Sequence, residues 1–197
     1  MPGRDVPADG GGPRFAYPVA LDLRDVPVLV VGAGPIGARK VEGLVAAGAA
    51  VRVVATEVSD ALDRSSVADV RERPFEVADL DGMRLVISAT GVEAVDAAVA
   101  DHARARGLWV NAADQPADCE FILPAIARAG RLTISVSTDG ASPALAGYLR
   151  DRAAELLTDR VVELAEELAA ERRAIQVAGG TTEGLDWRSR IVAALEE

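Results

Sequence analysis

The sequence has 197 residues, half of them apolar and about a quarter charged, which is typical of a chain that folds around a buried core. Its formal net charge of −10 and its single cysteine exclude a basic nucleic-acid-binding surface, an internal disulfide and a multi-cysteine zinc site. No apolar run approaches the roughly 20 residues that span a bilayer, so we expect a cytoplasmic protein without a membrane anchor.

The first part of the chain alternates between apolar strands and helices. Residues 1–14 are rich in Gly, Pro and charge and are predicted to be a disordered lead-in. Residues 15–23 predict a short edge strand, interrupted by Pro18. Further strands are expected at residues 28–31, 51–55, 70–74, 85–90 and 108–111, and helices at residues 35–47, 58–66 and 92–106. Residues 15–113 therefore predict a Rossmann-like α/β domain with a parallel sheet.

After residue 113 the pattern changes. Residues 121–127 and 132–137 are two β-rich runs joined by a turn with a glycine, which predicts an antiparallel hairpin. Because this hairpin cannot bury both faces against a completed sheet, we expect residues 114–148 to pair with a second copy of the chain in a homodimer. Residues 149–197 predict a small helical domain, in which one apolar stripe runs from Ala153 to Leu168 and a break follows at residues 179–182.

The glycine-rich turn after the first buried strand is the main cofactor signal. Gly32, Gly34 and Gly37 have the spacing GxGxxG between a predicted strand and a predicted helix. Glycine is needed there for the tight turn, for close approach to a pyrophosphate and for close packing of helix on strand. The free N–H groups at the start of the helix then face the phosphates. The alternative is an ordinary glycine-rich turn without a ligand.

Three other strands end in side chains that suit the same site. Parallel sheets bind ligands at the carboxyl ends of their strands, where the sequence places Thr56, Glu57, Thr90, Asn111 and Asp114. Glu57 lies slightly later than the acid that usually binds the adenosine ribose, and no basic residue is adjacent, which favours NAD over NADP. A solvated loop carboxylate is the alternative role for Glu57.

Asp114 is the candidate catalytic residue. It follows the strand at residues 108–111, where a nicotinamide and its substrate are expected to meet, and a carboxylate there accepts a proton while hydride leaves. A plain turn or helix-capping aspartate is the alternative. Asp118 and Asp139 are lesser candidates and are more typical of turns. His102 lies within a predicted helix and is expected to be a surface residue.

The single lysine of the chain, Lys40, excludes the Tyr-xxx-Lys pair of short-chain dehydrogenases, since Tyr148 is followed four residues later by Arg152. No pairing of His with an acid of the hydroxy-acid dehydrogenase kind is evident either.

Taken together, three motifs resemble precorrin-2 dehydrogenase, the N-terminal module of siroheme synthase. They are GAGPIGARK at residues 32–40, NAADQPADCEFILP at residues 111–124 and LTISVSTDGASPALA at residues 132–146. The likeness extends from about residue 17 to residue 157, and its last two motifs are much more specific than the glycine turn. The helical tail matches only loosely.

The resemblance implies an NAD-dependent oxidation of precorrin-2 to sirohydrochlorin, to which some members add insertion of Fe²⁺. It implies a homodimer interlocked through the segment after the Rossmann domain. Because the sequence stops well short of the methyltransferase module of the fused siroheme synthases, no methylation is expected. The family's essential aspartate falls on Asp114, and its cofactor contacts fall on Pro35, Ile36, Thr56 and Glu57. The residues expected to bind the substrate are Asn111, Arg128, Arg131, Ser137 and Thr138, with Arg150 and Arg152 as further cations, because arginine binds carboxylates in a bidentate way.

One departure weakens the likeness. Where many members have Gly, this chain has Asp139, which places a negative charge near a pocket for a polycarboxylate. Insertion of Fe²⁺ is therefore less strongly implied than dehydrogenation, and the matching role of Thr138 is weakened. Two other functions remain open: an NAD-sensing Rossmann module without catalysis, and a dehydrogenase of the same fold with another substrate.

Overall fold

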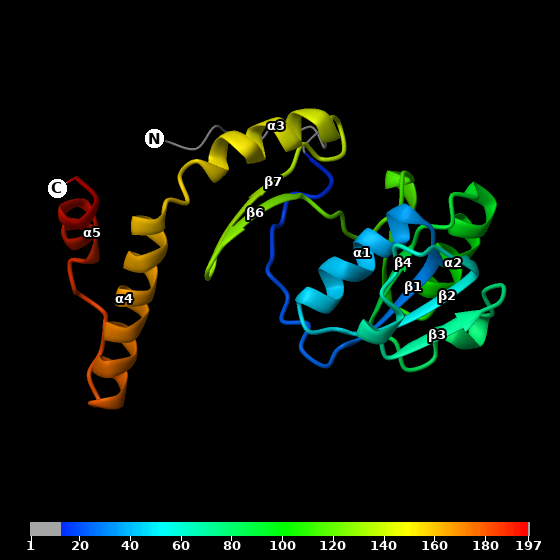
Figure 1. Cartoon of the computed structure of the whole chain (residues 1–197), viewed down its shortest axis with the longest axis horizontal. Helices are drawn as coiled ribbons and strands as arrows, with labels where there is room; N and C mark the ends of the chain where they lie inside the picture. The colour runs from blue at the N-terminus through cyan, green and yellow to red at the C-terminus, as the bar shows by residue number, and fades with distance from the viewer. Residues whose placement is uncertain (1–12, 197) are drawn as a thin grey trace. The chain divides into compact units, whose positions relative to one another are not determined.

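The structure is a computed structural model that describes residues 13–196 (Figure 1). The chain divides into two compact units, the first ending at Ile122 and the second beginning at Leu123. Most of the lead-in predicted from the sequence, residues 1–12, lies outside the described residues.

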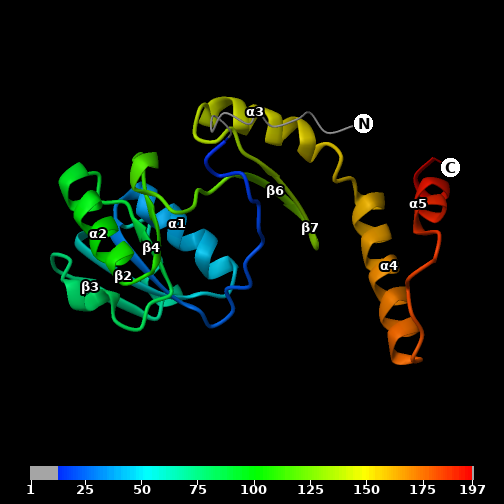
Figure 2. The same cartoon turned by 180° about the vertical axis from the view of Figure 1, so that it is seen from behind.

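The first unit contains a five-stranded sheet in which all neighbouring strands are parallel (Figure 2). The strand order is β3-β2-β1-β4-β5, which is the order of a doubly wound Rossmann fold. This confirms the predicted fold class. The strands are β1 Pro27–Ala33, β2 Ala50–Val58, β3 Asp69–Glu72, β4 Leu85–Ser88 and β5 Trp109–Ala112. The helices of this unit are α1 Pro35–Ala46 and α2 Glu93–Ala105, with short 3₁₀ turns η1 Arg64–Ser66, η2 Val77–Leu80 and η3 Pro116–Asp118.

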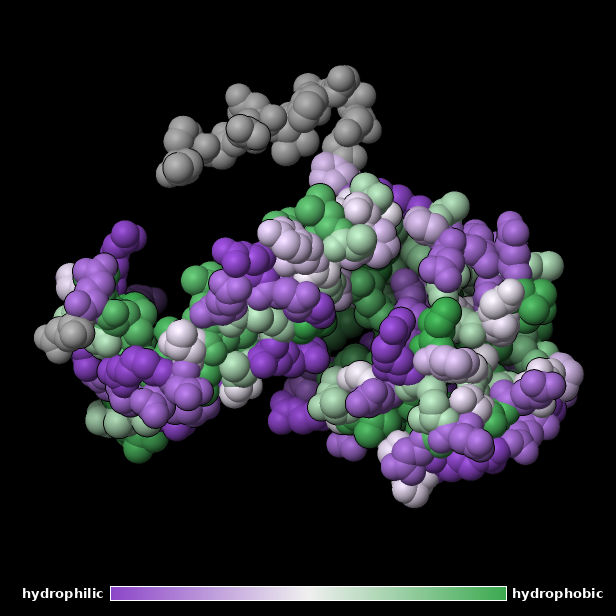
Figure 3. Space-filling model, turned by 45° about the horizontal axis from the view of Figure 1, so that its top comes forward, coloured by the Kyte–Doolittle hydropathy of each residue, from purple (hydrophilic) through white to green (hydrophobic). Residues whose placement is uncertain are grey.

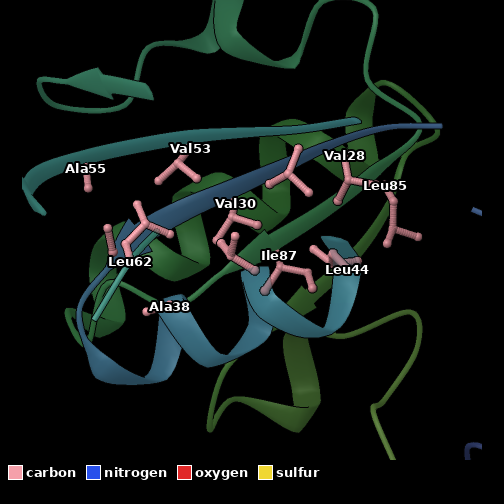
Figure 4. Packing of buried hydrophobic residues seen from close by; sticks show 12 residues of the cluster. Val28, Val30, Ala38, Leu44, Val53, Ala55, Leu62, Leu85 and Ile87 are labelled. Atoms are coloured by element: carbon pink, nitrogen blue, oxygen red, sulfur yellow. The ribbon is translucent and has the colours of Figure 1, made fainter. Parts of the chain in front are cut away.

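The central strand β1 is buried on both faces, which explains its continuous run of apolar residues. Val28 and Val30 pack in a cluster that includes Leu44 of α1, whereas Leu29 and Val31 pack on the opposite face with residues of α2. In Figure 4 the labelled side chains of the sheet and of α1 face one another across the first cluster. Burial of each such side chain stabilises the fold by about 1.5–3 kcal/mol, so β1 holds the glycine turn on a rigid base.

Two local predictions are wrong. Residues 15–23 form no strand, and among the described residues they have no ladder partner, which agrees with the missing N–H of Pro18. Residues 58–66 form no α-helix, because β2 continues to Val58 and only η1 is helical. There Asp63 accepts hydrogen bonds from the backbone N–H of Ser65 at 2.9 Å and from its hydroxyl at 2.7 Å. Such side-chain bonds offer the backbone an alternative to the helix.

A buried carboxylate fastens the segment after β3. Asp79 has no exposed surface and accepts two hydrogen bonds from Arg73, at 2.8 and 2.6 Å, and one from Arg71 at 2.8 Å. The backbone N–H of Glu76 donates a fourth at 2.9 Å. Burial by itself raises the pKa of Asp79, but the bonds from Arg73, Glu76 and Arg71 outweigh it and lower the pKa to about 2.

This lowered pKa predicts an acid-dependent loss of stability. A carboxyl group whose pKa is lower in the folded than in the unfolded chain stabilises the fold above the unfolded pKa, and this stabilisation is lost as the pH falls through the folded one. Asp79 is therefore expected to contribute about 2 kcal/mol at neutral pH, which disappears between about pH 4 and pH 2. Urea denaturation of the wild type and of Asp79→Asn at several pH values measures this. A difference between the two that does not shrink in acid would contradict the assignment.

The second unit begins with the predicted hairpin, which the structure confirms. Strands β6 Ala125–Ala129 and β7 Leu132–Val136 pair antiparallel, and α3 Pro143–Ala154 packs on them. Gly130 turns the hairpin with φ of 54°. A Cβ at this glycine would lie 2.9 Å from a methyl group of Val162, so the turn lies against α4, which spans Asp159–Val177.

The predicted apolar stripe belongs to two helices and not to one. The first, α3, ends before Thr158, and Thr158 caps α4 by accepting a hydrogen bond from the N–H of Val161 at 3.4 Å. The spacing of apolar residues gives no sign of this break, because Leu157 keeps the period across it. The feature of the sequence that indicates the start of α4 is Thr158 followed by Asp159, because threonine caps helices and an acid is favoured in the first turn. A last helix, α5, spans Trp187–Glu196.

Candidate functional site

The strand order reverses at β1, and a parallel α/β sheet is expected to bind its ligand at such a point, beside the glycine turn. Strands β2 and β4 lie on either side of β1, so the connections that follow β1 and β4 leave the sheet on opposite faces. The carboxyl ends of β1, β4 and β5 are therefore the expected edge for a ligand. All of the predicted cofactor residues, together with Asn111 and Asp114, belong to this edge or to the neighbouring end of β2.

The glycine turn has the geometry that a dinucleotide needs. A Cβ on Gly32 would lie 2.3 Å from the carbonyl oxygen of Ala89, and one on Gly37 would lie 2.2 Å from that of Gly32. These two glycines therefore let β1, α1 and the end of β4 approach one another. A Cβ on Gly34 would meet nothing within 4 Å, so the middle glycine faces open space. This open position is where a pyrophosphate is expected to approach the backbone.

The start of α1 is free to bind an anion. Gly34 is its N-cap and supplies no side-chain hydrogen bond, and Pro35 occupies the first turn. The N–H groups at the start of a helix carry partial positive charge and lack partners within the helix. Ile36 is 44% exposed, as expected for a residue beside a ligand. The residues of the turn thus fit a dinucleotide.

The end of β2 presents the two residues expected to contact the adenosine ribose. Thr56 and Glu57 are both exposed within the last part of the strand. The register between β1 and β2 shifts after Val31, so that Ala33 pairs with Val58. The extra residues form a bulge that contains Thr56 and Glu57, and bulges commonly redirect side chains beside functional sites.

A buried acid of α2, which was not expected from the sequence, binds the residues at the end of β4. Asp96 of α2 is 1% exposed and accepts hydrogen bonds from the Ser88 hydroxyl and from both the N–H and the hydroxyl of Thr90, the last two at 3.1 and 2.9 Å. The hydroxyl of Thr90 is thus engaged inside the protein. Thr90 shapes the β4–α2 connection, and its role as a cofactor ligand stays a prediction. An acid in the first turn of the helix after the strand is the feature of the sequence that could have indicated this role.

Removal of this acid is expected to destabilise the first unit. Asp96→Ala leaves the buried hydroxyl of Ser88 and the N–H of Thr90 without their acceptor, which costs about 2–4 kcal/mol. Asp101→Ala on the same helix removes only a surface ion pair to Arg104 and should cost less than about 1 kcal/mol. Urea denaturation of both variants tests this, and equal losses of stability would contradict it.

The end of β5 carries Asn111 and the candidate base. Asn111 is 6% exposed, and its amide nitrogen donates to the carbonyl oxygen of Phe121 at 3.0 Å while its oxygen accepts from Lys40 Nζ at 3.4 Å. The side chain is therefore engaged within the first unit, which is not the arrangement expected of a substrate ligand. Asp114 is exposed in the following turn with φ of 61°. Aspartate adopts this left-handed conformation more readily than most residues.

The turn that carries Asp114 is held from both sides. The Cys119 thiol is 2% exposed, accepts from the N–H of Ala112 at 3.3 Å and lies 3.2 Å from its carbonyl oxygen. Burial raises the pKa of this thiol. The guanidinium of Arg14 binds the carbonyl oxygens of Pro116 and Cys119 at 2.6 and 2.8 Å. Neither residue was expected at the site, because their role depends on contacts far apart in the chain.

The remaining predicted substrate residues belong to the second unit. Arg131 binds Glu166 of α4 through two hydrogen bonds of 2.8 and 2.7 Å, so its charge is already paired. Arg128 is exposed on β6, and its guanidinium has no ion pair with a carboxylate of the described residues. Ser137 and Thr138 form the loop before α3, where the Ser137 hydroxyl accepts from the N–H of Asp139 and the Thr138 hydroxyl bonds to Ser142.

Asp139 has φ of 56°, a conformation that favours glycine. This agrees with the glycine that the resemblance expects at the same position.

Between residues 13 and 196, no three side chains of His, Cys, Asp or Glu are grouped as metal ligands. No helix in the same part of the chain is long and apolar enough to cross a membrane.

Comparisons with known proteins identify the family. A model described as putative NAD(P)-binding matches residues 19–125, which is more than half of the chain, and one described as sirohaem biosynthesis protein central matches residues 130–153. The siroheme synthase of Methylococcus capsulatus is 44% identical over 160 residues, and that of Methylobacillus flagellatus is 42% identical over 163 residues. These matches cover 79% and 81% of this chain but 33% and 35% of the relatives, so the chain spans about a third of their length.

A solved structure agrees with these relatives. The chain is similar to SirC, precorrin-2 dehydrogenase, with a TM-score of 0.68 and 27% identity, over 91% of this chain and 88% of that one. The chain therefore belongs to the family of NAD(P)-binding siroheme biosynthesis proteins that includes siroheme synthases and precorrin-2 dehydrogenase.

Proposed function

We propose that this protein oxidises precorrin-2 to sirohydrochlorin with NAD⁺ as the acceptor. The observation that carries the proposal is the position of Asp114, an exposed carboxylate in the turn after β5, on the same sheet edge as a glycine turn that fits a dinucleotide. The likeness to a precorrin-2 dehydrogenase supports the choice of substrate.

Gly32, Gly34 and Gly37, with the start of α1, would hold the pyrophosphate, and Ile36 would lie against the dinucleotide. Thr56 and Glu57 would bind the adenosine ribose through its hydroxyl groups. When bound, NAD⁺ supplies the hydride acceptor. The exposed carboxylate of Glu57 would repel the 2′-phosphate of NADP, and this supports NAD as the cofactor.

Asp114 would accept the proton that the substrate loses. Oxidation of precorrin-2 removes a hydride and a proton, which yields sirohydrochlorin, NADH and H⁺. Because the product is more conjugated than the substrate, the protein mainly has to hold the reacting carbon in position. A carboxylate within hydrogen-bond reach then takes the proton as general base.

The carboxylates of the substrate require cations, and we propose Arg128 as the first of them. Its guanidinium is exposed and has no acidic partner within the described part of the chain. Arg131 pairs with Glu166, Arg150 with Asp151, and Arg152 with Glu155, so each would have to exchange a partner to bind substrate. Ser137 and Thr138 stay candidates for hydrogen bonds to the same carboxylates. Asn111 stays a candidate too, although its side chain is already hydrogen-bonded to Lys40 and to the carbonyl oxygen of Phe121.

An anaerobic assay of NADH formation from precorrin-2 and NAD⁺ tests the proposal. The wild type is expected to form NADH and sirohydrochlorin in equal amounts. Absence of NADH would overturn the proposal, and NAD⁺ binding measured by calorimetry would then separate an NAD-sensing module from a protein that binds no dinucleotide. NADP⁺ is expected to be the poorer acceptor.

We further propose that the second unit forms a homodimer. A two-stranded sheet leaves one edge of each strand unpaired, and an isolated hairpin is marginally stable in water. The outward face of α3 adds apolar surface, since Leu145, Tyr148 and Leu149 are 48%, 63% and 42% exposed. Figure 3 shows hydrophobic residues, in green, exposed among hydrophilic residues, in purple. Light scattering after size exclusion is expected to give twice the mass of one chain, and a monomer would remove the proposal.

Insertion of Fe²⁺ into sirohydrochlorin is a second candidate activity, because the two relatives described above are named siroheme synthases. Formation of siroheme from sirohydrochlorin and Fe²⁺ under anaerobic conditions tests it separately, without NAD⁺. The cytoplasmic location expected from the sequence stays a prediction.

A further inference from the structure

An arginine that precedes the Rossmann sheet binds the loop that follows the candidate base. The guanidinium of Arg14 donates hydrogen bonds to the carbonyl oxygens of Pro116, Ala117 and Cys119, at 2.6, 3.2 and 2.8 Å. The first two residues belong to η3, and Cys119 is its C-cap. Carbonyl groups at the C-terminal end of a helix lack partners within the helix, and an arginine side chain can satisfy them. Arg14 therefore closes the C-terminal end of η3.

The start of the same loop contains Asp114. This residue is two positions before Pro116, and its φ of 61° is a left-handed conformation. Between the two, the N–H of Gln115 donates to the carbonyl oxygen of Ala112 at 3.3 Å. Gln115 also precedes a proline, which restricts its backbone. A displacement of Pro116 would therefore reach Asp114 through one residue that has little freedom to absorb it.

The inner side of the loop has an anchor of another kind. The buried Cys119 sulfur lies 3.3 Å from the backbone nitrogen of Ala112, and 3.2 and 3.3 Å from the carbonyl oxygens of Ala112 and Gln115. Sulfur is a weak donor and a weak acceptor, whereas hydrogen bonds from a guanidinium are strengthened by its charge. Arg14 is thus the stronger of the two anchors.

The segment between Arg14 and β1 is mostly exposed. Its large apolar side chains Tyr17, Val19 and Leu21 are 88%, 58% and 46% exposed. Arg14 nevertheless binds carbonyl groups that are more than 100 positions away in the sequence. The contact with the loop is therefore made by this side chain and is not a by-product of packing along the segment.

We propose that Arg14 is a positioning residue, whose guanidinium keeps the loop of residues 114–119 closed and thereby holds the Asp114 carboxylate in place for the substrate. The proposal rests on the function proposed above, in which Asp114 accepts a proton. Arg14 binds backbone oxygens and exchanges no proton with the substrate. Its contribution is to alignment, because a general base acts only within hydrogen-bond reach of the proton that it removes.

The single cysteine of the chain allows a test that does not depend on activity. Iodoacetamide reaches the buried Cys119 only when the loop opens, so the rate of alkylation of the folded protein, followed by mass spectrometry, reports the open fraction. Arg14→Gln should speed alkylation by about threefold or more. Burial raises the pKa of this thiol and Arg14 lowers it, so loss of Arg14 without opening would slow alkylation instead.

Arg24→Gln is the matched control, because Arg24 belongs to the same exposed segment and pairs only locally, with Asp22. Faster alkylation in Arg14→Gln but not in Arg24→Gln supports the proposal. An unchanged or slower rate in Arg14→Gln, or an equal increase in both variants, would overturn it. So would an increase that is fully accounted for by a loss of global stability, which urea denaturation measures. None of these outcomes depends on whether the protein oxidises precorrin-2, so failure of this proposal and failure of the proposed function are distinguishable.

A second measurement addresses the role of Arg14 in the reaction. Arg14→Gln should lower kcat for precorrin-2 oxidation by about tenfold and leave the Kd for NAD⁺ unchanged, since the glycine turn is not part of this loop. Arg14→Lys keeps the charge and can bind part of the same set of carbonyl groups, so it should restore part of kcat. An equal loss of kcat in Arg14→Gln and Arg24→Gln, or a loss confined to NAD⁺ binding, would overturn the proposal.

Discussion

Replacement of Asp114 by asparagine is expected to lower kcat for precorrin-2 oxidation by about 10²–10⁴-fold, the usual contribution of a general base. Binding of NAD⁺ should change little, because Asp114 lies in the turn after β5 and not in the glycine turn. Anaerobic turnover gives the first quantity and calorimetry with NAD⁺ gives the second.

Asparagine is the appropriate replacement because of the backbone. Asp114 has φ of 61°, and asparagine adopts the left-handed conformation as readily as aspartate does. Asp114→Ala would add about 1 kcal/mol of backbone strain and mix a folding effect with the chemical one. Asp118→Asn in the same loop serves as the control and should retain activity. Full activity of Asp114→Asn would remove the assigned role while leaving the proposed reaction intact.

Replacement of Gly32 by alanine is expected to have the largest effect on folding. The added Cβ would lie 2.3 Å from the carbonyl oxygen of Ala89 and 2.6 Å from its carbonyl carbon, and Gly32 has φ of 97°. Since backbone atoms must move and the residue must adopt a strained conformation, a loss of about 3 kcal/mol or more is expected. Urea denaturation measures the loss, and NAD⁺ binding should disappear with it.

Two other glycines separate folding from binding. Gly34→Ala adds a Cβ that meets nothing within 4 Å, so the variant should fold normally but bind NAD⁺ at least about tenfold more weakly, a loss of roughly 1.4 kcal/mol or more. Gly43→Ala, on the exposed side of α1, should stabilise the protein by about 0.5–1 kcal/mol and leave binding unchanged. Binding of NAD⁺ by Gly34→Ala as tight as that of the wild type would show that the pyrophosphate does not approach this glycine.

The local pattern of the chain was sufficient for the elements whose signals are local. The run at residues 28–31 predicted a buried strand because a strand covered on both faces is apolar throughout, and the GxGxxG spacing predicted the turn that follows it. The hairpin was also predictable, because its turn glycine separates two apolar runs. Local signals were insufficient at Asp63 and Thr158, where side-chain hydrogen bonds end a helix or prevent one without changing the apolar period.

The sequence by itself determined the alternation of the five parallel strands with α1 and α2, the cofactor turn and the position of Asp114 at a strand end, because each depends on residues close together in the chain. Only the tertiary structure decided which side chains support that aspartate. Lys40 and Asn111 are 71 positions apart, and Arg14 lies more than 100 positions from the carbonyl groups that it binds. Such contacts depend on how α1 and the N-terminal segment pack against the sheet, which no local period encodes. The same packing brought the only lysine of the chain to Asn111 at the end of β5.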